Sequence, residues 1–390
     1  MPRWPIRPRT GSWPSSRRYS SYHESVDVPC GSAGRVTIDL YNISKHSPSS
    51  ALIVHLPAFP AVRPKTPLPL PSFLQQWPVA SINYRWSNQP EPRQADFSPS
   101  LAWPTPVHDV GFAFSWLKEN LTPDDGRRSV YAYGSHLGAS LAVSLALTEA
   151  HSHARFGVKG VLAYNGVYNW TMFLPDHRIN KSARMTKTAA RPRTDSQMQM
   201  LTEQIPTLFH VPSRMFDPFA SPSLLFHSPG LEVPKTFGLS ATESRMIDAL
   251  ANRTFDAQVI VKPPRKAHMV FPPRQSTLKI PDACLLYTTP PPILTAKGEP
   301  TKRRVSSRGN TLEAQAQELA ELMRRSIDKV ELKERSKWDD DLDTWARQQQ
   351  RRVQTMAVGE ERSILELGDV GKAVAMAWLG ERMCSPKTSV

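Results

Sequence analysis

SVYAYGSHLGASLAVSLALTE, residues 129–149, is the stretch that decides the fold of this chain. Its first five residues alternate small with β-branched or aromatic side chains, which favours a strand, and its last eleven are rich in alanine and leucine, which favours a helix. Gly134 and Gly138 bracket the short turn between them, because glycine permits close backbone approach. Histidine tolerates a positive φ better than most residues. The sequence therefore predicts a strand, a tight turn centred on His136 and a helix.

Other strands and helices alternate with this unit. Apolar runs bounded by prolines predict buried strands at 51–56 and 79–84, and a helical spacing of apolar residues predicts a helix within 107–120. Such alternation favours an α/β fold with a mainly parallel sheet and helices on both faces. Further strands are predicted at 35–43, 158–164, 283–288 and 330–333, and further helices after Asn310, over 339–353 and over 369–379.

Four landmarks together resemble the α/β-hydrolase fold-3 family of esterases and lipases. GSHLG, residues 134–138, stands where that family has its Gly-x-Ser-x-Gly nucleophile elbow, and HLPA, residues 55–58, where it has a His-Gly-Gly-Gly oxyanion segment. NYRW, residues 83–86, is similar to its Asp-Tyr-Arg-Leu strand end, and Asp109 with Trp116 to two residues of its next helix. The resemblance implies an α/β-hydrolase domain and a catalytic triad in the order Ser, Asp or Glu, His.

The elbow and the oxyanion segment both depart from the family pattern. In the elbow, His136 takes the place of the nucleophilic serine. In the oxyanion segment, Pro57 takes a glycine position and has no N–H to donate. The sequence thus predicts a degenerate elbow, Gly134, Ser135, His136, Leu137 and Gly138, and a degenerate oxyanion segment, His55, Leu56, Pro57 and Ala58.

The triad acid and base are not found where the resemblance places them. The acid is expected after the strand at 283–288, but residues 289–310 contain only Glu299. The base is expected after the last predicted strand, near Lys333, yet the final histidine of the chain is His268. We therefore expect no confident catalytic residue.

Two alternatives at the elbow remain open. Ser135 is a candidate displaced nucleophile, although a shift of one residue points its hydroxyl away from the oxyanion donors. His136 is a candidate nucleophile or metal ligand, although no His, Asp or Glu cluster shows ligand spacing with it. A histidine that fills a defunct pocket is the simpler interpretation.

Composition bounds the class of protein. With 390 residues, 39% of them hydrophobic, the chain can bury a full core, and its 37 prolines predict many loops. A net charge of +14 favours an anionic partner, such as RNA or a ribonucleoprotein. No apolar run is long enough to predict a membrane span. The three cysteines show no ligand spacing, so we expect no metal, and we expect no cofactor.

The first 23 residues are typical of a mitochondrial transit peptide. They hold five arginines and no acidic residue, and Arg17-Arg18-Tyr19-Ser20-Ser21 resembles the site cut by the matrix processing peptidase. Four prolines interrupt the amphipathic helix of such a peptide, so a disordered basic tail is the alternative. The composition predicts a mitochondrial matrix protein.

Five segments follow from these patterns. They are a basic segment (1–23), a first part of the hydrolase-like domain (24–175), a lid-like insertion (176–234), a second part of the domain (235–335) and a helical C-terminal extension (336–390). Two basic stretches offer candidate phosphate contacts, with solvated loops as the equal alternative. The candidates are Arg184, Lys187, Arg191, Arg193, Lys302, Arg303 and Arg304.

The sequence thus predicts a catalytically degenerate α/β-hydrolase-like protein. Its basic charge and transit-like segment favour a structural or binding component of a mitochondrial assembly, similar to the enzyme-derived subunits of mitochondrial ribosomes. An active carboxylesterase or lipase-like hydrolase with a non-standard site is the alternative. A third hypothesis is a small-molecule binding protein that keeps the hydrolase pocket without the chemistry. The sequence predicts no oligomeric state.

Overall fold

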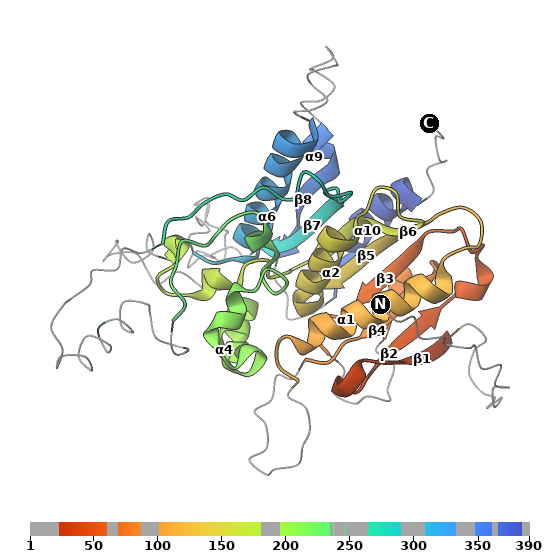
Figure 1. Cartoon of the computed structure of the whole chain (residues 1–390), viewed down its shortest axis with the longest axis horizontal. Helices are drawn as coiled ribbons and strands as arrows, with labels where there is room; N and C mark the ends of the chain where they lie inside the picture. The colour runs from red at the N-terminus through yellow and green to blue at the C-terminus, as the bar shows by residue number, and fades with distance from the viewer. Residues whose placement is uncertain are drawn as a thin grey trace, which may run out of the picture.

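A computed structural model describes residues 23–60, 69–86, 101–180, 196–234, 237, 246, 264–289, 309–332, 348–360 and 366–383. In this part of the chain an eight-stranded sheet runs in the order β1-β2-β4-β3-β5-β6-β7-β8 (Figure 1). Its strands are β1 (His23–Pro29), β2 (Arg35–Tyr41), β3 (Leu52–Leu56), β4 (Val79–Asn83), β5 (Arg128–Ser135), β6 (Phe156–Tyr164), β7 (Asp282–Thr289) and β8 (Val353–Glu360).

The sheet is mainly parallel. Strands β1, β2 and β4 pair antiparallel at one edge, and β4, β3, β5, β6, β7 and β8 pair parallel across the rest. The central strands β3 and β5 are buried almost throughout, as expected where helices cover both faces of a sheet. The predicted α/β class is therefore confirmed.

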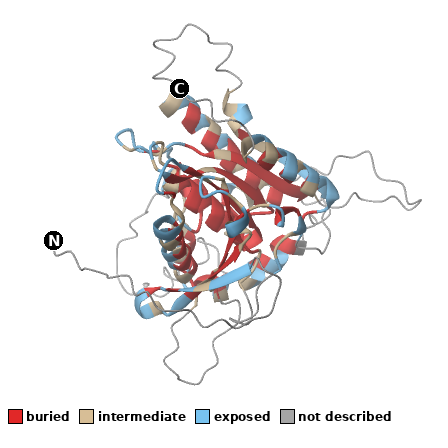
Figure 2. Ribbon diagram, turned by 90° about the vertical axis from the view of Figure 1, so that its right-hand side faces the viewer, coloured by how far each residue is buried: buried red, intermediate tan, exposed pale blue. Residues whose placement is uncertain are grey.

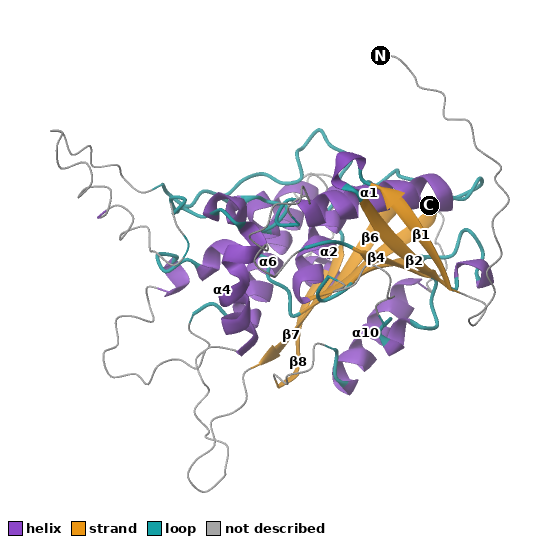
Figure 3. Ribbon diagram, turned by 90° about the horizontal axis from the view of Figure 1, so that it is seen from below, coloured by secondary structure: helices purple, strands orange, loops and turns teal. Residues whose placement is uncertain are grey.

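Helices form a layer on each face of the sheet (Figure 3). Helices α1 (Thr105–Leu121), α2 (His136–Glu149) and α6 (Leu312–Ser326) bury their apolar residues in one core, and α10 (Asp369–Met383) buries Trp378 and Leu379 in the other. Red, buried residues fill both layers in Figure 2. Other helices of the described ranges are α4 (Ser196–Phe209), α9 (Gln348–Arg352), the π-helix Ile327–Leu332 and the 3-10 helices Gly31–Ala33, Ile43–Lys45, Ser72–Leu74, Trp170–Phe173, Pro212–Phe216 and Pro222–Leu225.

An aromatic cluster attaches α4 to the sheet. Trp86, which follows β4, packs against Trp103 and Phe209 with ring centroids 5.6 and 5.7 Å apart. The indole of Trp86 donates a hydrogen bond to the carbonyl of Leu208 at 2.9 Å. Such rings bury large apolar areas, so α4 belongs to the main core although it lies in the stretch expected to be a lid.

The end of the sheet differs from the prediction. The expected last strand at 330–333 is wrong, because Ile327–Leu332 forms a π-helix that extends α6 and buries Ile327 and Leu332. The last strand is β8, which pairs with β7 inside the stretch expected to be a helical extension. Its buried residues are only Val353 and Val358, so this edge strand lacks the apolar alternation that sequence reasoning requires.

Three smaller differences complete the comparison. Strand β1 was not predicted, since its residues are mostly exposed at the sheet edge. The helix expected after Asn310 is α6, and its cap is the Thr311 hydroxyl, which accepts from the N–H of Ala314. Of the helix predicted over 339–353, residues 339–347 lie outside the described residues. No helix in the described ranges has the length and apolarity needed to cross a bilayer.

Candidate functional site

The elbow is a strained strand-to-helix turn at the centre of the sheet. Ser135 ends β5 in extended geometry, and His136 opens α2 with a φ of 47°. A Cβ atom on Gly138 would overlap the carbonyl oxygens of Leu56 and Pro57, so only glycine fits there. The glycines and His136 thus hold the turn in the geometry that positions a nucleophile in related folds.

The imidazole of His136 is packed among rings. It is 1% exposed, stacks on Phe59 with centroids 5.8 Å apart, and meets Tyr164 edge-on at 5.9 Å. A nucleophile has to reach the carbonyl carbon it attacks, and these neighbours leave almost none of the ring accessible. His136 therefore fills the place of the nucleophile as a core side chain.

The oxyanion segment is closed onto the elbow. The N–H of Leu137, the residue that follows the nucleophile position, donates to the carbonyl oxygen of Ala58 at 3.2 Å. That N–H is one of the two donors that form an oxyanion hole in this type of site. The carbonyl of Pro57 in turn accepts from the hydroxyl of Tyr84 at 2.9 Å. One expected donor is thus already bonded within the protein, and Pro57 has none to offer.

His55, the first residue of that segment, is a buried neutral imidazole. Its Nδ1 lies 2.9 Å from Oγ of Ser81, and its ring stacks on Tyr133 with centroids 5.6 Å apart. Burial lowers the pKa of His55 to about 3. An imidazole with so low a pKa is a weak general base near neutral pH.

The observed strands change where the resemblance places the triad acid and base. The base belongs after the last strand, which is β8 rather than the segment before Lys333. The chain still has no histidine beyond His268, so the conclusion about the base is unchanged. Glu299, the sole acid expected after β7, lies outside the described residues.

A cavity of about 340 Å³ adjoins the elbow at the carboxyl ends of β3 and β5. We call it the elbow cavity. Phe59 lines it on one side and stacks on His136 on the other, which separates the cavity from the imidazole. Its polar lining consists of His55, Ser72, Tyr133, Ser135, Glu366 and Lys372.

Ser135, His55 and Glu366 therefore line one cavity, a set that includes a hydroxyl, an imidazole and a carboxylate. In a working catalytic triad the serine hydroxyl is hydrogen-bonded to the imidazole, and the imidazole is hydrogen-bonded to the carboxylate. Neither bond exists among the described residues, and the Nδ1 atom of His55 is engaged with Ser81 instead. The three groups share a cavity without forming a triad.

Sequence reasoning missed Glu366 and Lys372. Glu366 lies in the connection between β8 and α10, and Lys372 lies in the first turns of α10. Because the sequence predicted the last strand at 330–333, the residues that follow β8 were not considered as part of the site. Strand β8 has only two buried residues and no apolar alternation, so no sequence pattern located the residues that follow it.

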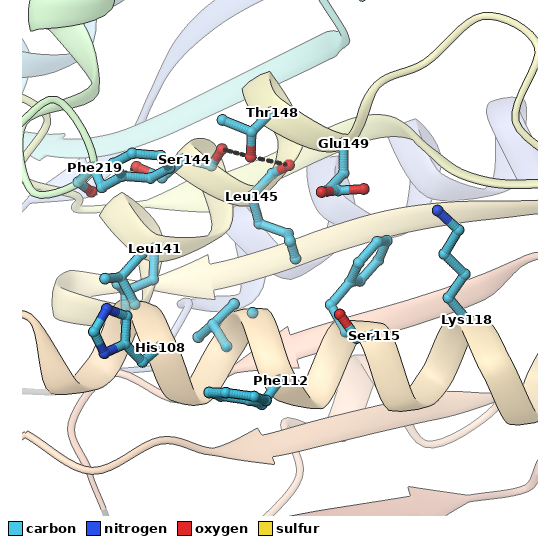
Figure 4. A pocket seen from close by; sticks show the side chains of 14 residues that line it. His108, Phe112, Ser115, Lys118, Leu141, Ser144, Leu145, Thr148, Glu149 and Phe219 are labelled. Atoms are coloured by element: carbon cyan, nitrogen blue, oxygen red, sulfur yellow. Dashed lines mark hydrogen bonds between the residues drawn. The ribbon is translucent and has the colours of Figure 1, made fainter. Parts of the chain in front are cut away.

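A larger groove of about 500 Å³ lies elsewhere, between α1 and α2 (Figure 4). Phe112 and Phe219 line it, and Lys118 and Glu149 stand near one end. Two of its hydroxyls are bonded within the protein, because Ser144 donates to the carbonyl of Phe219 at 2.7 Å and Thr148 to that of Ser144 at 2.9 Å. The groove contains no residue of the elbow.

Several predicted residues cannot be placed. The transit-like residues 1–22 lie outside the described residues. So do all the candidate phosphate contacts, namely Arg184, Lys187, Arg191, Arg193, Lys302, Arg303 and Arg304. Within the part of the chain that is described, no three His, Cys, Asp or Glu side chains gather as a metal site would require.

No family model matches the sequence. Esterase LipQ of Mycobacterium tuberculosis is 25% identical over 258 residues, which span 62% of this chain and 53% of the esterase. The chain therefore spans about half the length of that relative.

Solved structures of esterases resemble the chain at low identity. Carboxyl esterase 2 of Tuber melanosporum is 11% identical, with 93% of this chain and 86% of that chain covered and a TM-score of 0.46. A hyperthermophilic esterase of Pyrobaculum calidifontis is 13% identical, with 92% and 82% covered and a TM-score of 0.45. The strand order and the strand–turn–helix elbow are those of an α/β-hydrolase-like fold, and the sequence is similar to that of Esterase LipQ.

Proposed function

We propose that this protein is a catalytically degenerate α/β-hydrolase that binds a partner or ligand instead of hydrolysing an ester. The observation that carries the proposal is the buried imidazole of His136 at the elbow, where the fold presents a serine hydroxyl. An acyl-transfer mechanism requires an exposed nucleophile, a base oriented toward it and free oxyanion donors.

The surroundings of His136 support the proposal. The N–H of Leu137 is bonded to Ala58, and Pro57 has no N–H, so neither group is free to stabilise an oxyanion. Loss of a single oxyanion donor typically lowers the rate about 100- to 1,000-fold. The nucleophile, the base and the oxyanion donors thus all differ from those of an active hydrolase, whereas the strand–turn–helix elbow is retained.

The wider role rests on the charge of the chain. We place the protein in the mitochondrial matrix, with an anionic partner such as RNA in a ribonucleoprotein assembly. The support is the net charge of +14 and the arginine-rich, acid-free start of the sequence. Sedimentation of mitochondrial lysate tests this role: the protein should travel with a large assembly and shift to light fractions after ribonuclease. Recovery of the protein in light fractions before ribonuclease treatment overturns it.

Ester hydrolysis is the second candidate function. Two observations favour it: the similarity to a protein named an esterase, and the presence of Ser135, His55 and Glu366 around one cavity. In this version Ser135 is the nucleophile and attacks from the elbow cavity. A shift of His55 away from Ser81 is then needed to bring its imidazole to the serine.

Turnover of p-nitrophenyl butyrate separates the two candidates. The wild-type protein is compared with Ser135→Ala and His136→Ala, with Ser72→Ala as a matched control from the exposed rim of the same cavity. We expect all four proteins to hydrolyse the ester at the same background rate. A wild-type rate well above background that Ser135→Ala or His136→Ala abolishes, while Ser72→Ala keeps it, establishes the esterase instead.

A further inference from the structure

We propose that the elbow cavity is a binding site for a small aromatic monocarboxylate, with the ring inside the cavity and the carboxylate at Lys372. The inference rests on the proposed function, because a site that no longer turns over an ester is free to hold a ligand. It is argued from the shape of the cavity walls and from the charges at its mouth.

The walls suit a flat, apolar body. Four prolines, Pro57, Pro60, Pro69 and Pro71, and three aromatic rings, Phe59, Phe73 and Tyr133, face the same space. These rigid faces lose little side-chain entropy when a ligand packs on them, and aromatic rings interact favourably with one another. The volume of about 340 Å³ falls within the usual range of about 300–1,000 Å³ for small-molecule sites.

The position in the fold also favours a ligand. The cavity lies at the carboxyl ends of β3 and β5, and open α/β sheets bind their ligands outside the carboxyl ends of the strands. Its floor offers neutral polar groups only, the hydroxyls of Tyr133 and Ser135 and the imidazole of His55. A charged group of the ligand therefore has to lie at the mouth.

Two charged side chains line that mouth, Lys372 from the first turns of α10 and Glu366 just before the helix. In the described residues neither side chain forms an ion pair, with the other or with any third group. Lys372 is half-buried whereas Glu366 is exposed. Since solvent screens an exposed charge more than a half-buried one, the field inside the mouth favours an anion.

The experiment measures binding of 3-phenylpropionate to the purified full-length protein by calorimetry. Two probes of the same shape serve as comparisons, the neutral 3-phenylpropanamide and the cationic 3-phenylpropylamine. We expect the acid to bind most tightly and the amine most weakly. Equal binding of all three, tighter binding of the amine, or no binding of the acid overturns the inference.

Three variants locate the site. Lys372→Met should weaken binding of the acid about fivefold, the effect of losing about 1 kcal/mol of a partly screened charge contact. Glu366→Gln should strengthen it, because a repelling charge is removed. Lys118→Met, which removes the same charge from the groove between α1 and α2, should leave it unchanged.

If Lys372→Met binds the acid as tightly as wild type, the proposed site is wrong. It is also wrong if Lys118→Met weakens binding of the acid as much as Lys372→Met does. Near-UV circular dichroism of each variant shows that the fold is retained. The ester assay keeps the two proposals apart. If the protein neither binds the acid nor hydrolyses p-nitrophenyl butyrate, only the ligand is wrong; if it hydrolyses the ester, the proposed function is wrong whatever it binds.

Discussion

The N–H of Leu137 donates a hydrogen bond to the carbonyl oxygen of Ala58 at 3.2 Å, which ties the first turn of α2 to the loop after β3. In an active site of this fold the same N–H points at the developing oxyanion. In this protein the bond engages that N–H with the backbone. Restoring the nucleophile alone does not break this bond.

His136→Ser should accordingly remain inactive. The new hydroxyl has neither an oriented base nor a free oxyanion donor, so we expect its initial rate with p-nitrophenyl butyrate to stay within about twofold of wild type. His136→Ala is the matched control for loss of the stacked ring. A rise of about 100-fold or more in His136→Ser alone contradicts the interpretation of the elbow.

Gly138→Ala should destabilise the protein strongly. The added Cβ overlaps the backbone oxygens of Leu56 and Pro57, which cannot move without displacing β3, and we expect a loss of at least about 2 kcal/mol. Gly111→Ala is the control, because a Cβ there meets nothing within 4 Å and helix α1 should gain about 0.5–1 kcal/mol. Urea unfolding of both variants gives the comparison. Similar midpoints for the two contradict the close approach at the elbow.

Asp109 should be a major contributor to stability. It is fully buried and accepts from Arg85 through Nη2 at 2.6 Å, Nε at 2.9 Å and the backbone N–H at 2.8 Å. The hydrogen bonds with Asp109 raise the pKa of the Arg85 guanidinium. Asp109→Ala leaves that guanidinium without its carboxylate partner, so we expect a loss of about 3–5 kcal/mol in unfolding free energy. Asp125→Ala, at an exposed position, should change it by less than about 0.5 kcal/mol.

The sheet and the elbow could be predicted from sequence because their signals are local. Buried central strands such as β3 show continuous apolar runs, and Gly134 and Gly138 mark the turn directly. Strand β8 gives no such signal, since an edge strand with two buried residues reads as polar sequence. Local pattern thus located the centre of the fold but not its border.

The contacts around the elbow could be recognised only from the structure. That a histidine, His136, stands at the centre of the elbow is visible in the sequence, but the bond between Leu137 and Ala58 depends on how α2 meets β3 in space. The elbow cavity likewise joins β3, β5 and the start of α10, which are far apart along the chain. Contacts of this kind follow from tertiary packing, which local periodicity does not encode.

Glu318 should make stability depend on pH below about pH 4.5. Burial alone raises the pKa of this carboxyl, but the imidazole of His227 at 3.4 Å, a hydrogen bond from Asn169 and the charge of Lys266 at 3.2 Å together outweigh it and lower the pKa to about 2. A folded-state pKa below the unfolded value of about 4.3 means that the contribution is complete above pH 4.5 and is lost as the pH falls toward 2. The shift corresponds to roughly 3 kcal/mol.

Glu318→Gln should therefore be less stable than wild type at pH 7, and its urea midpoint should decline less between pH 4.5 and pH 2. Glu321→Gln, exposed on the same helix, is the control and should follow the wild-type curve. Identical pH profiles for wild type and Glu318→Gln contradict the role of this buried network, because the carboxyl would then bind protons equally well in the folded and unfolded chains.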